Sequence, residues 1–150
     1  MGRTAREIEI LLVEDNPGDV RLTLEALSEA RVKNRMIVAR DGAEALDVLY
    51  RRGSYADASR PDLVLLDLNL PKVNGREVLA RIKQDPELKT IPVVVLTTSD
   101  SDFEVEQAYK AGANSYITKP VAFENFMKVI HSIEDFWLSI VRLPPRQEGA

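Results

Sequence analysis

Five short apolar runs alternate along the chain with stretches of helical periodicity, and this alternation constrains the fold more than any other feature. Three of the runs are continuously apolar, as the strands of a parallel sheet covered on both faces must be. The predicted strands are residues 8–13, 36–39, 63–66, 92–96 and 116–118. With helices between them, they predict an α/β fold: a three-layer sandwich around a doubly wound, five-stranded parallel sheet.

Residues that start and stop helices lie between the predicted strands. Asp15, Asn16, Asp41 and Asn74 are cap candidates, and Ser99 to Asp102 supply another cap. The predicted helices begin near Pro17, span residues 43–51, run from Gly75 to before Pro86, end at Ala111 and Gly112, and span about residues 122–141.

The composition excludes several classes of protein. The 150 residues include no cysteine, which rules out a disulfide scaffold, a thiolate zinc site and a thiol nucleophile. Lys and Arg number 20 against 24 Asp and Glu, with no basic block, so direct binding of nucleic acid is not expected. The apolar runs are too short to span a bilayer. We therefore expect one cytoplasmic domain with its core at residues 8–141, tails at 1–7 and 143–150, and no output domain.

Polar residues follow four of the predicted strands at their carboxyl ends, which is where open α/β sheets bind ligands. Glu14 and Asp15 follow the first strand, Asp67 the third, Thr97 the fourth and Lys119 the fifth. If the fold is right, three carboxylates, one hydroxyl and one ammonium group converge in one pocket.

This set of groups has a chemical logic. Clustered carboxylates repel one another and favour a bound cation, and oxygen ligands without sulfur or imidazole point to Mg²⁺. Beside that ion, Asp67 can act as a carboxylate nucleophile toward a phosphoryl group. Thr97 and Lys119 would then contact the phosphoryl oxygens.

Four motifs carrying these residues resemble the receiver domain of two-component response regulators. They are LVEDN at 12–16, LDLNLP at 66–71, LTTS at 96–99 and YITKP at 116–120. The resemblance covers roughly residues 8 to 140. It implies a flavodoxin-like sheet with strand order 2-1-3-4-5.

The resemblance also implies a site. A histidine kinase would donate its phosphoryl group to Asp67, with Mg²⁺ held by Glu14, Asp15, Asp67 and the backbone carbonyl of Asn69. Lys119 would pair with the phosphoaspartate.

Further residues of the motifs take regulatory roles by the same resemblance. Thr97 and Tyr116 would be the switch pair, while Asn69 and Ser99 would tune hydrolysis of the acyl phosphate. Thr98 would narrow access to the acceptor. The bond between Lys119 and Pro120 is expected to be cis.

A narrower resemblance lies at the C-terminus. Residues 133–145 (IEDFWLSIVRLPP), with 13–19 (VEDNPGD), are similar to the single-domain regulators that partner bacterial phytochromes, which are light-sensing histidine kinases. Members of that group are often homodimers. A phytochrome-type kinase is therefore the expected partner.

The last predicted helix has an apolar face about 200° wide at 100° per residue, more than a helix covering a sheet needs. The excess predicts a homodimer with Phe136, Trp137 and Ile140 as anchors, since aromatic anchors dominate interface energies. The alternative is that residues 143–145 fold back over this face.

Two other functions compete with a phosphorylated switch. An aspartate-nucleophile phosphatase would need a second acid two residues after Asp67, where this chain has Asn69, and its nucleophile usually follows the first strand. A constitutive scaffold would work without phosphorylation, and the intact pocket argues against it.

Overall fold

The sheet in the computed structural model, which describes residues 7–120 and 122–145, has the predicted architecture. Its strand order is β2-β1-β3-β4-β5, and every neighbouring pair is parallel. The predicted fold class and strand order are therefore confirmed. The strands are β1 (Ile8–Val13), β2 (Asn34–Ala39), β3 (Leu63–Leu66), β4 (Val93–Thr97) and β5 (Ser115–Thr118).

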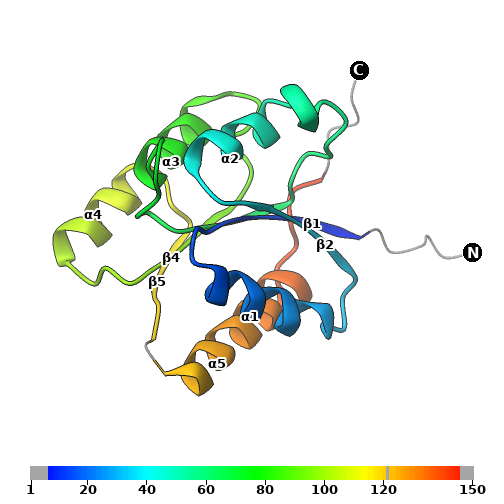
Figure 1. The fold of residues 1–150 in the computed structure, drawn as a ribbon, viewed down its shortest axis with the longest axis vertical. Coiled ribbons are helices and arrows are strands. Elements are labelled where there is room, and N and C mark those ends of the chain that lie inside the picture. Colours follow the sequence, from blue (N-terminus) through cyan, green and yellow to red (C-terminus); the bar gives the residue numbers. More distant parts are fainter. Residues whose placement is uncertain (1–6, 121, 146–150) are drawn as a thin grey trace, which may run out of the picture.

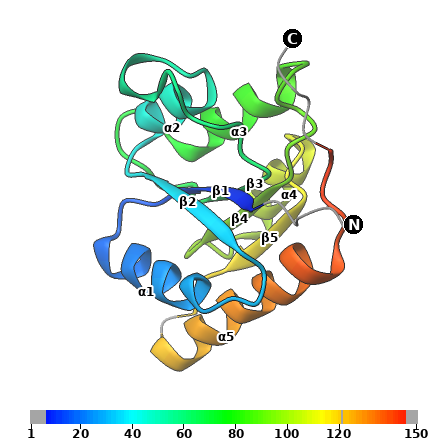
Figure 2. The same cartoon turned by 90° about the vertical axis from the view of Figure 1, so that its right-hand side faces the viewer.

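Helices cover both faces of the sheet. In Figures 1 and 2, α1 (Pro17–Ser28) and α5 (Phe123–Ile133) lie together on one face, while α2 (Gly42–Leu49) and α3 (Gly75–Gln84) lie on the other. The helix α4 (Asp102–Lys110) contributes Ala108 to the core on the side of α2 and α3. This three-layer arrangement leaves the loops at the carboxyl ends of the strands free to form a site.

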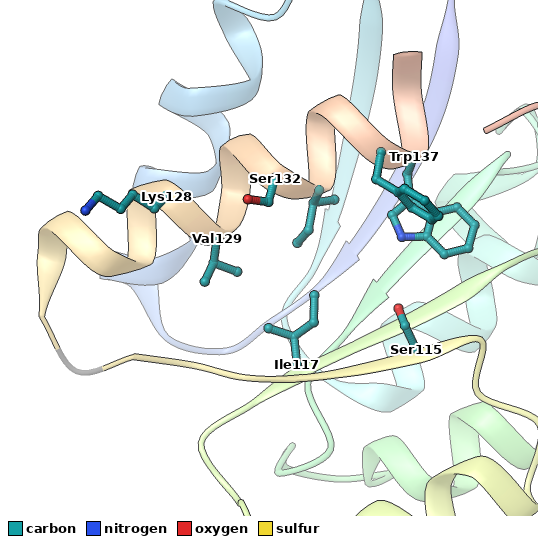
Figure 3. Close-up of a pocket in the computed structure, with 8 residues that line it drawn as sticks. Ser115, Ile117, Lys128, Val129, Ser132 and Trp137 are labelled. Carbon is teal, nitrogen blue, oxygen red and sulfur yellow. The ribbon is translucent and has the colours of Figure 1, made fainter. Parts of the chain in front are cut away.

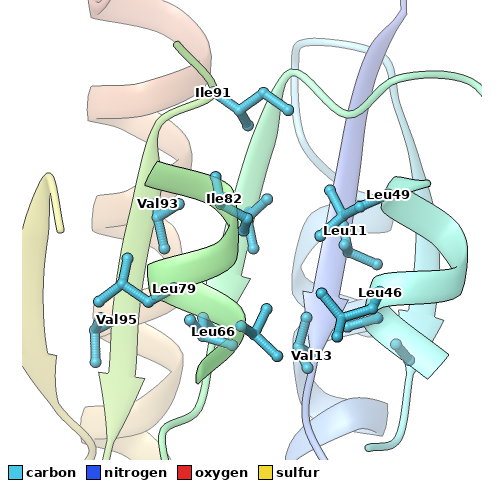
Figure 4. Close-up of a cluster of buried hydrophobic side chains, with 14 of the residues drawn as sticks. Leu11, Val13, Leu46, Leu49, Leu66, Leu79, Ile82, Ile91, Val93 and Val95 are labelled. Atoms are coloured by element: carbon cyan, nitrogen blue, oxygen red, sulfur yellow. The ribbon is translucent and has the colours of Figure 1, made fainter. Parts of the chain in front are cut away.

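Two apolar clusters, one on each face, make up the core because successive strand side chains point to opposite faces. Leu11, Val13 and Leu66 pack against α2 and α3 in one cluster, as Figure 4 shows. Ile10, Leu12 and Leu65 belong to the other, with residues of α1 and α5. Every residue of β3 and β4 is buried, which explains why these two strands read as unbroken apolar runs.

Side-chain caps begin four of the helices, and in each the cap oxygen accepts the backbone N–H of the residue three positions on. The caps are Asn16 for α1, Asp41 for α2, Asn74 for α3 and Ser101 for α4. Asn16, not Asp15, caps α1, which leaves the Asp15 carboxylate available to the site.

Some element boundaries differ from the prediction. β2 begins at Asn34, two residues early, because its backbone pairs with β1 from Ile8 onward although Asn34 and Arg35 are polar. α2 ends at Leu49, and Arg51 takes a left-handed backbone with φ of 55°. The last helix continues beyond α5 as a π-helical segment, Glu134–Ile140.

The expected cis bond before Pro120 is wrong. No peptide bond of the described residues is cis, and trans is the lower-energy form even for a bond preceding proline.

Among the described residues, every helix is too short or too polar to cross a membrane.

Candidate functional site

The backbone of the sheet sets the positions of the predicted site residues. Val13 and Leu66 are partners in the β1–β3 register, and the Asp67 N–H donates to the Val13 carbonyl at 3.0 Å. Glu14 and Asp67 therefore leave adjacent strands side by side. On the other side, the Lys119 N–H donates to the Thr97 carbonyl at 2.7 Å. One edge of the sheet thus gathers groups from four strands.

Asp67 lies at the centre of this edge, and its side chain is bonded at both oxygens. Oδ1 accepts the Thr97 hydroxyl at 2.9 Å and the Asn69 backbone N–H at 3.0 Å. Oδ2 accepts from Lys119 Nζ at 2.9 Å. The residue is 7% exposed, so these bonds replace most of its hydration.

Lys119 is the cation of the site and contacts three carboxylates. Its Nζ donates to Glu14 Oε2, to Asp67 Oδ2 at 2.9 Å and to Asp19 Oδ2 at 3.0 Å. An ammonium group has three N–H donors, so these contacts account for all of them. With Lys119 and Glu14 both buried, the group is a desolvated ionic network and not a surface ion pair.

Burial and ion pairing have opposite effects on the pKa of each group in this network. Burial raises the pKa of Glu14 to about 7, against the lowering effect of the Lys119 ammonium. Burial alone would lower the pKa of Lys119, but the bonds from Glu14 and Asp67 outweigh it and raise the pKa. Lys119 therefore stays charged, and the site as a whole carries excess negative charge.

The donor set fits a hard divalent cation. Carboxylate oxygens of Glu14, Asp15 and Asp67 lie within 4.8 Å of one another. Glu14 and Asp67 are buried while Asp15 is exposed, which leaves water access on one side of the set. Mg²⁺ commonly keeps several waters and takes one or two carboxylates, so both the ligand type and the open side suit it.

The other predicted site residues lie at different depths. Thr97 is fully buried, whereas Thr98 and Asn69 are exposed and Ser99 is half-buried. The Asn69 side chain reaches Thr97 Oγ1 at 3.5 Å. Tyr116 is half-buried on β5, and its hydroxyl donates to the Ser99 carbonyl at 2.8 Å, so the ring is tied to the loop after β4.

Two site residues escaped the sequence analysis in this role. Asp19 contacts Lys119 from the first turn of α1, and its place at the start of a helix that follows the acidic pair was the available signal. From the sequence, Gly75 is predicted only to begin a helix. A Cβ atom there would stand 2.2 Å from the Asp67 carbonyl oxygen, so α3 can approach Asp67 this closely only through glycine.

The predicted dimer anchors lie away from this edge, in the segment after α5. Phe136 is 51% and Ile140 72% exposed, while Trp137 is half-buried. The Phe136 and Trp137 rings meet edge to face with centroids 5.5 Å apart. Residues 143–145 are described and leave Phe136 and Ile140 exposed, so the fold-back alternative does not hold for these two side chains.

An acidic pair, a buried aspartate, a threonine and a lysine at the carboxyl ends of a 2-1-3-4-5 sheet define a receiver domain. The sequence model of the response regulator receiver domain matches residues 10–131, and the chain belongs to that family. It is 49% identical over 135 residues to the response regulator Rcp1 of Synechocystis sp., covering 90% of this chain and 92% of Rcp1.

Solved structures agree with the sequence match. The crystal structure of Mn²⁺-bound Rcp1 has a TM-score of 0.90 at 48% identity, over 92% of this chain and 99% of that one. The phosphorylated cyanobacterial phytochrome response regulator RcpA has a TM-score of 0.91 at 50% identity, over 93% of this chain and 100% of that one.

A further relative in sequence is the probable methanogenesis regulatory protein FilR2 of Methanothrix harundinacea. It is 45% identical over 90% of this chain and 86% of its own length.

Proposed function

We propose that this protein is a response regulator that accepts a phosphoryl group on Asp67 from a sensor histidine kinase and then changes its protein contacts. The observation that carries the proposal is the environment of Asp67. It is a buried carboxylate bonded by Thr97 and Lys119 and set within an acidic, metal-compatible group. A carboxylate kept for structure alone would not need two further carboxylates, those of Glu14 and Asp19, around the same ammonium group.

In the proposed step, an Asp67 carboxylate oxygen attacks the phosphorus of a phosphohistidine. The O–P bond forms, the P–N bond breaks, and the electron pair of that bond stays on the imidazole nitrogen. The Thr97 hydroxyl and the Lys119 ammonium, already 2.9 Å from the Asp67 oxygens, are placed to turn to the phosphoryl oxygens. Held by Glu14, Asp15, Asp67 and the Asn69 backbone carbonyl, Mg²⁺ would supply charge neutralisation.

The switch in this proposal runs from Thr97 to Tyr116. When the Thr97 hydroxyl moves toward the phosphoryl group, the space on its side of β4 changes, and Tyr116 on the neighbouring strand responds with its ring. Ser99, whose carbonyl holds the Tyr116 hydroxyl, and Asn69 would tune the lifetime of the acyl phosphate. Thr98, exposed beside them, would narrow access to Asp67.

The proposed partner is a phytochrome-type histidine kinase. The similarity to RcpA, a phytochrome response regulator, supports this partner. The 45% identity to FilR2, a probable methanogenesis regulatory protein, is the reason that the partner has to be tested. Such a kinase phosphorylates its own histidine with ATP. Because ATP is a cytoplasmic substrate, the transfer to Asp67 would take place in the cytoplasm. Phosphotransfer profiling against the histidine kinases of the source organism decides the point: preferential transfer from a phytochrome supports the assignment, and preference for another kinase overturns it.

We also propose a homodimer through the segment after α5. Beside Phe136 and Trp137 lies a groove of about 420 Å³ between α5 and the edge strand β5, seen in Figure 3. Ser115 lines this groove. Among the buried side-chain oxygens and nitrogens of the described residues, its Oγ lacks a hydrogen-bond partner. A second copy of the chain would fill the groove with its own aromatic side chains, and by symmetry the groove of that copy would receive Phe136 and Trp137 of the first.

The dimer is tested by sedimentation velocity. Phe136→Asp and Ile140→Asp should shift the protein toward monomer. Phe123→Asp should not, although Phe123, at the start of α5, has an exposed fraction between those of the two anchors. A wild-type protein that is monomeric at every concentration, with and without phosphorylation, overturns the dimer.

Phosphorylation itself is tested with acetyl phosphate and Mg²⁺. One acid-stable, alkali-labile phosphoryl group should appear by intact mass, and it should be absent from Asp67→Asn. Failure of the wild type to take up phosphate overturns the function. The phosphatase alternative has no support at position 69, where Asn69 provides no second carboxylate.

A further inference from the structure

Asp19 is the third acidic partner of Lys119, and it differs from the other two. Its Oδ2 lies 3.0 Å from Lys119 Nζ, as close as that of Asp67. Its side chain is 24% exposed, against 5% for Glu14 and 9% for Asp67. It is also the one partner of the three that does not belong to the metal-compatible group of Glu14, Asp15 and Asp67.

This difference matters once a cation binds. Glu14 and Asp67, two of the three carboxylates that Lys119 now contacts, belong to the group that would hold a divalent ion. An ammonium buried to 5% exposure that loses two acceptors pays a large desolvation penalty unless another acceptor remains. Asp19 is that acceptor.

A plain role in the helix does not explain the orientation of Asp19. It occupies the third position of α1, where a Glu or Gln side chain can reach back to the backbone N–H of the cap residue. Here the N–H of the cap, Asn16, donates to Glu14 Oε1 at 3.1 Å instead. The Asp19 side chain turns to Lys119, which lies 100 residues along the chain.

The backbone around Asp19 is held in place. Its N–H donates to Asn16 Oδ1 at 3.0 Å, and its carbonyl accepts the Thr23 hydroxyl at 2.7 Å. The carboxylate is therefore presented from a fixed first turn, not from a loop.

We propose that Asp19 is a positioning residue of the phosphorylation site. It keeps the Lys119 ammonium in place beside Asp67 when Glu14 and Asp67 engage the cation. The inference rests on the proposed function for its use in phosphoryl transfer, although cation binding tests it separately.

The test is a double-mutant cycle on Mn²⁺ affinity, with free Mn²⁺ measured by electron paramagnetic resonance. Asp19→Asn should weaken Mn²⁺ binding by about three- to tenfold in the wild-type background, the net scale of one ordinary intramolecular hydrogen bond. In the Lys119→Met background the same change should have little effect, because there is no ammonium to position. An equal loss in both backgrounds would mean that Asp19 acts only through its charge, and no loss in either would remove its role; both overturn the inference.

Glu77→Gln is the matched control. Glu77 is likewise the third residue of a helix capped by asparagine, but it pairs with Arg81 on the surface. Glu77→Gln should leave the Mn²⁺ affinity unchanged. The Mn²⁺ affinities of the Asp19 and Lys119 variants are compared with the affinity of this control.

A second measurement covers the case in which Lys119→Met does not fold. In ¹⁵N-lysine-labelled protein with Mg²⁺, the Lys119 ammonium should give a slowly exchanging NMR signal that Asp19→Asn broadens or removes. An unchanged signal overturns the inference. Uptake of phosphate from acetyl phosphate by the wild type is recorded in parallel, so failure of the proposed function and failure of the Asp19 role give different results.

Discussion

Thr97 Oγ1 donates a hydrogen bond of 2.9 Å to Asp67 Oδ1, across the parallel pair β3 and β4. The two residues are 30 apart in sequence, and both side chains are buried. The Thr97 hydroxyl is thus already directed at Asp67, and under the proposed function it is preorganised for the transferred group.

Thr97→Ala should slow phosphoryl uptake from acetyl phosphate by about 10²-fold, the scale of losing one preorganised donor. Thr97→Ser keeps the hydroxyl and should stay within a few-fold of the wild type. Rates come from intact-mass time courses at saturating Mg²⁺. If the alanine variant reacts as fast as the wild type, the hydroxyl does not assist the transfer.

Gly75→Ala should lower the free energy of unfolding by about 1–3 kcal/mol, because the new Cβ would overlap the backbone of Asp67 and Leu68. Urea denaturation measures the change. Gly18→Ala is the matched control, since its Cβ would meet only Asn16 Oδ1 at 3.3 Å, and we expect a change within about 0.5 kcal/mol. Equal effects of the two variants would contradict the close packing of α3 on Asp67.

Lys119→Met should destabilise the metal-free protein by about 3–5 kcal/mol, because it leaves buried carboxylates without their cation. Lys110→Met, which breaks an exposed pair with Glu106, should cost less than about 1 kcal/mol. Chemical denaturation in EDTA compares the two, and Mg²⁺ should restore part of the loss in Lys119→Met only.

The cost of Lys119→Met should also depend on pH. Burial raises the pKa of Glu14 to about 7 even with Lys119 present, and removing the ammonium raises it further. Above the ordinary glutamate value of 4.5, the folded variant then binds more protons than its unfolded chain, so its stability falls as the pH rises. Denaturation in EDTA at about pH 5 and about pH 8 should show the larger loss at the higher pH; the reverse order would contradict the burial of Glu14 in a carboxylate cluster.

Tyr116→Phe should cost about 1 kcal/mol of stability, since it removes the hydrogen bond to the Ser99 carbonyl. Hydrogen exchange should speed up in the loop after β4 and stay unchanged in β1. Phosphoryl uptake should change little, because the variant keeps the ring and the lost hydroxyl bonds to Ser99 and not to Asp67. Unchanged exchange in that loop would show that the hydroxyl does not anchor it.

The sequence by itself determined the sheet, the layers and the class of site. β3 and β4 could be predicted because strands buried on both faces must be apolar throughout, and the caps Asn16, Asp41 and Asn74 could be predicted because capping is a contact within three residues. Glu14, Asp67, Thr97 and Lys119 could be grouped because parallel strands bring their carboxyl ends to one edge.

Only the tertiary structure decided how these groups divide their contacts. No local pattern tells that the three donors of Lys119 go to Glu14, Asp67 and Asp19, because Asp19 and Lys119 meet only when α1 docks beside the end of β5. The approach of Gly75 to Asp67 and the exposure of Phe136 likewise depend on how a helix packs as a body. Periodicity and capping are fixed within a few residues of chain, whereas contacts across 100 residues are set by sheet register and helix docking.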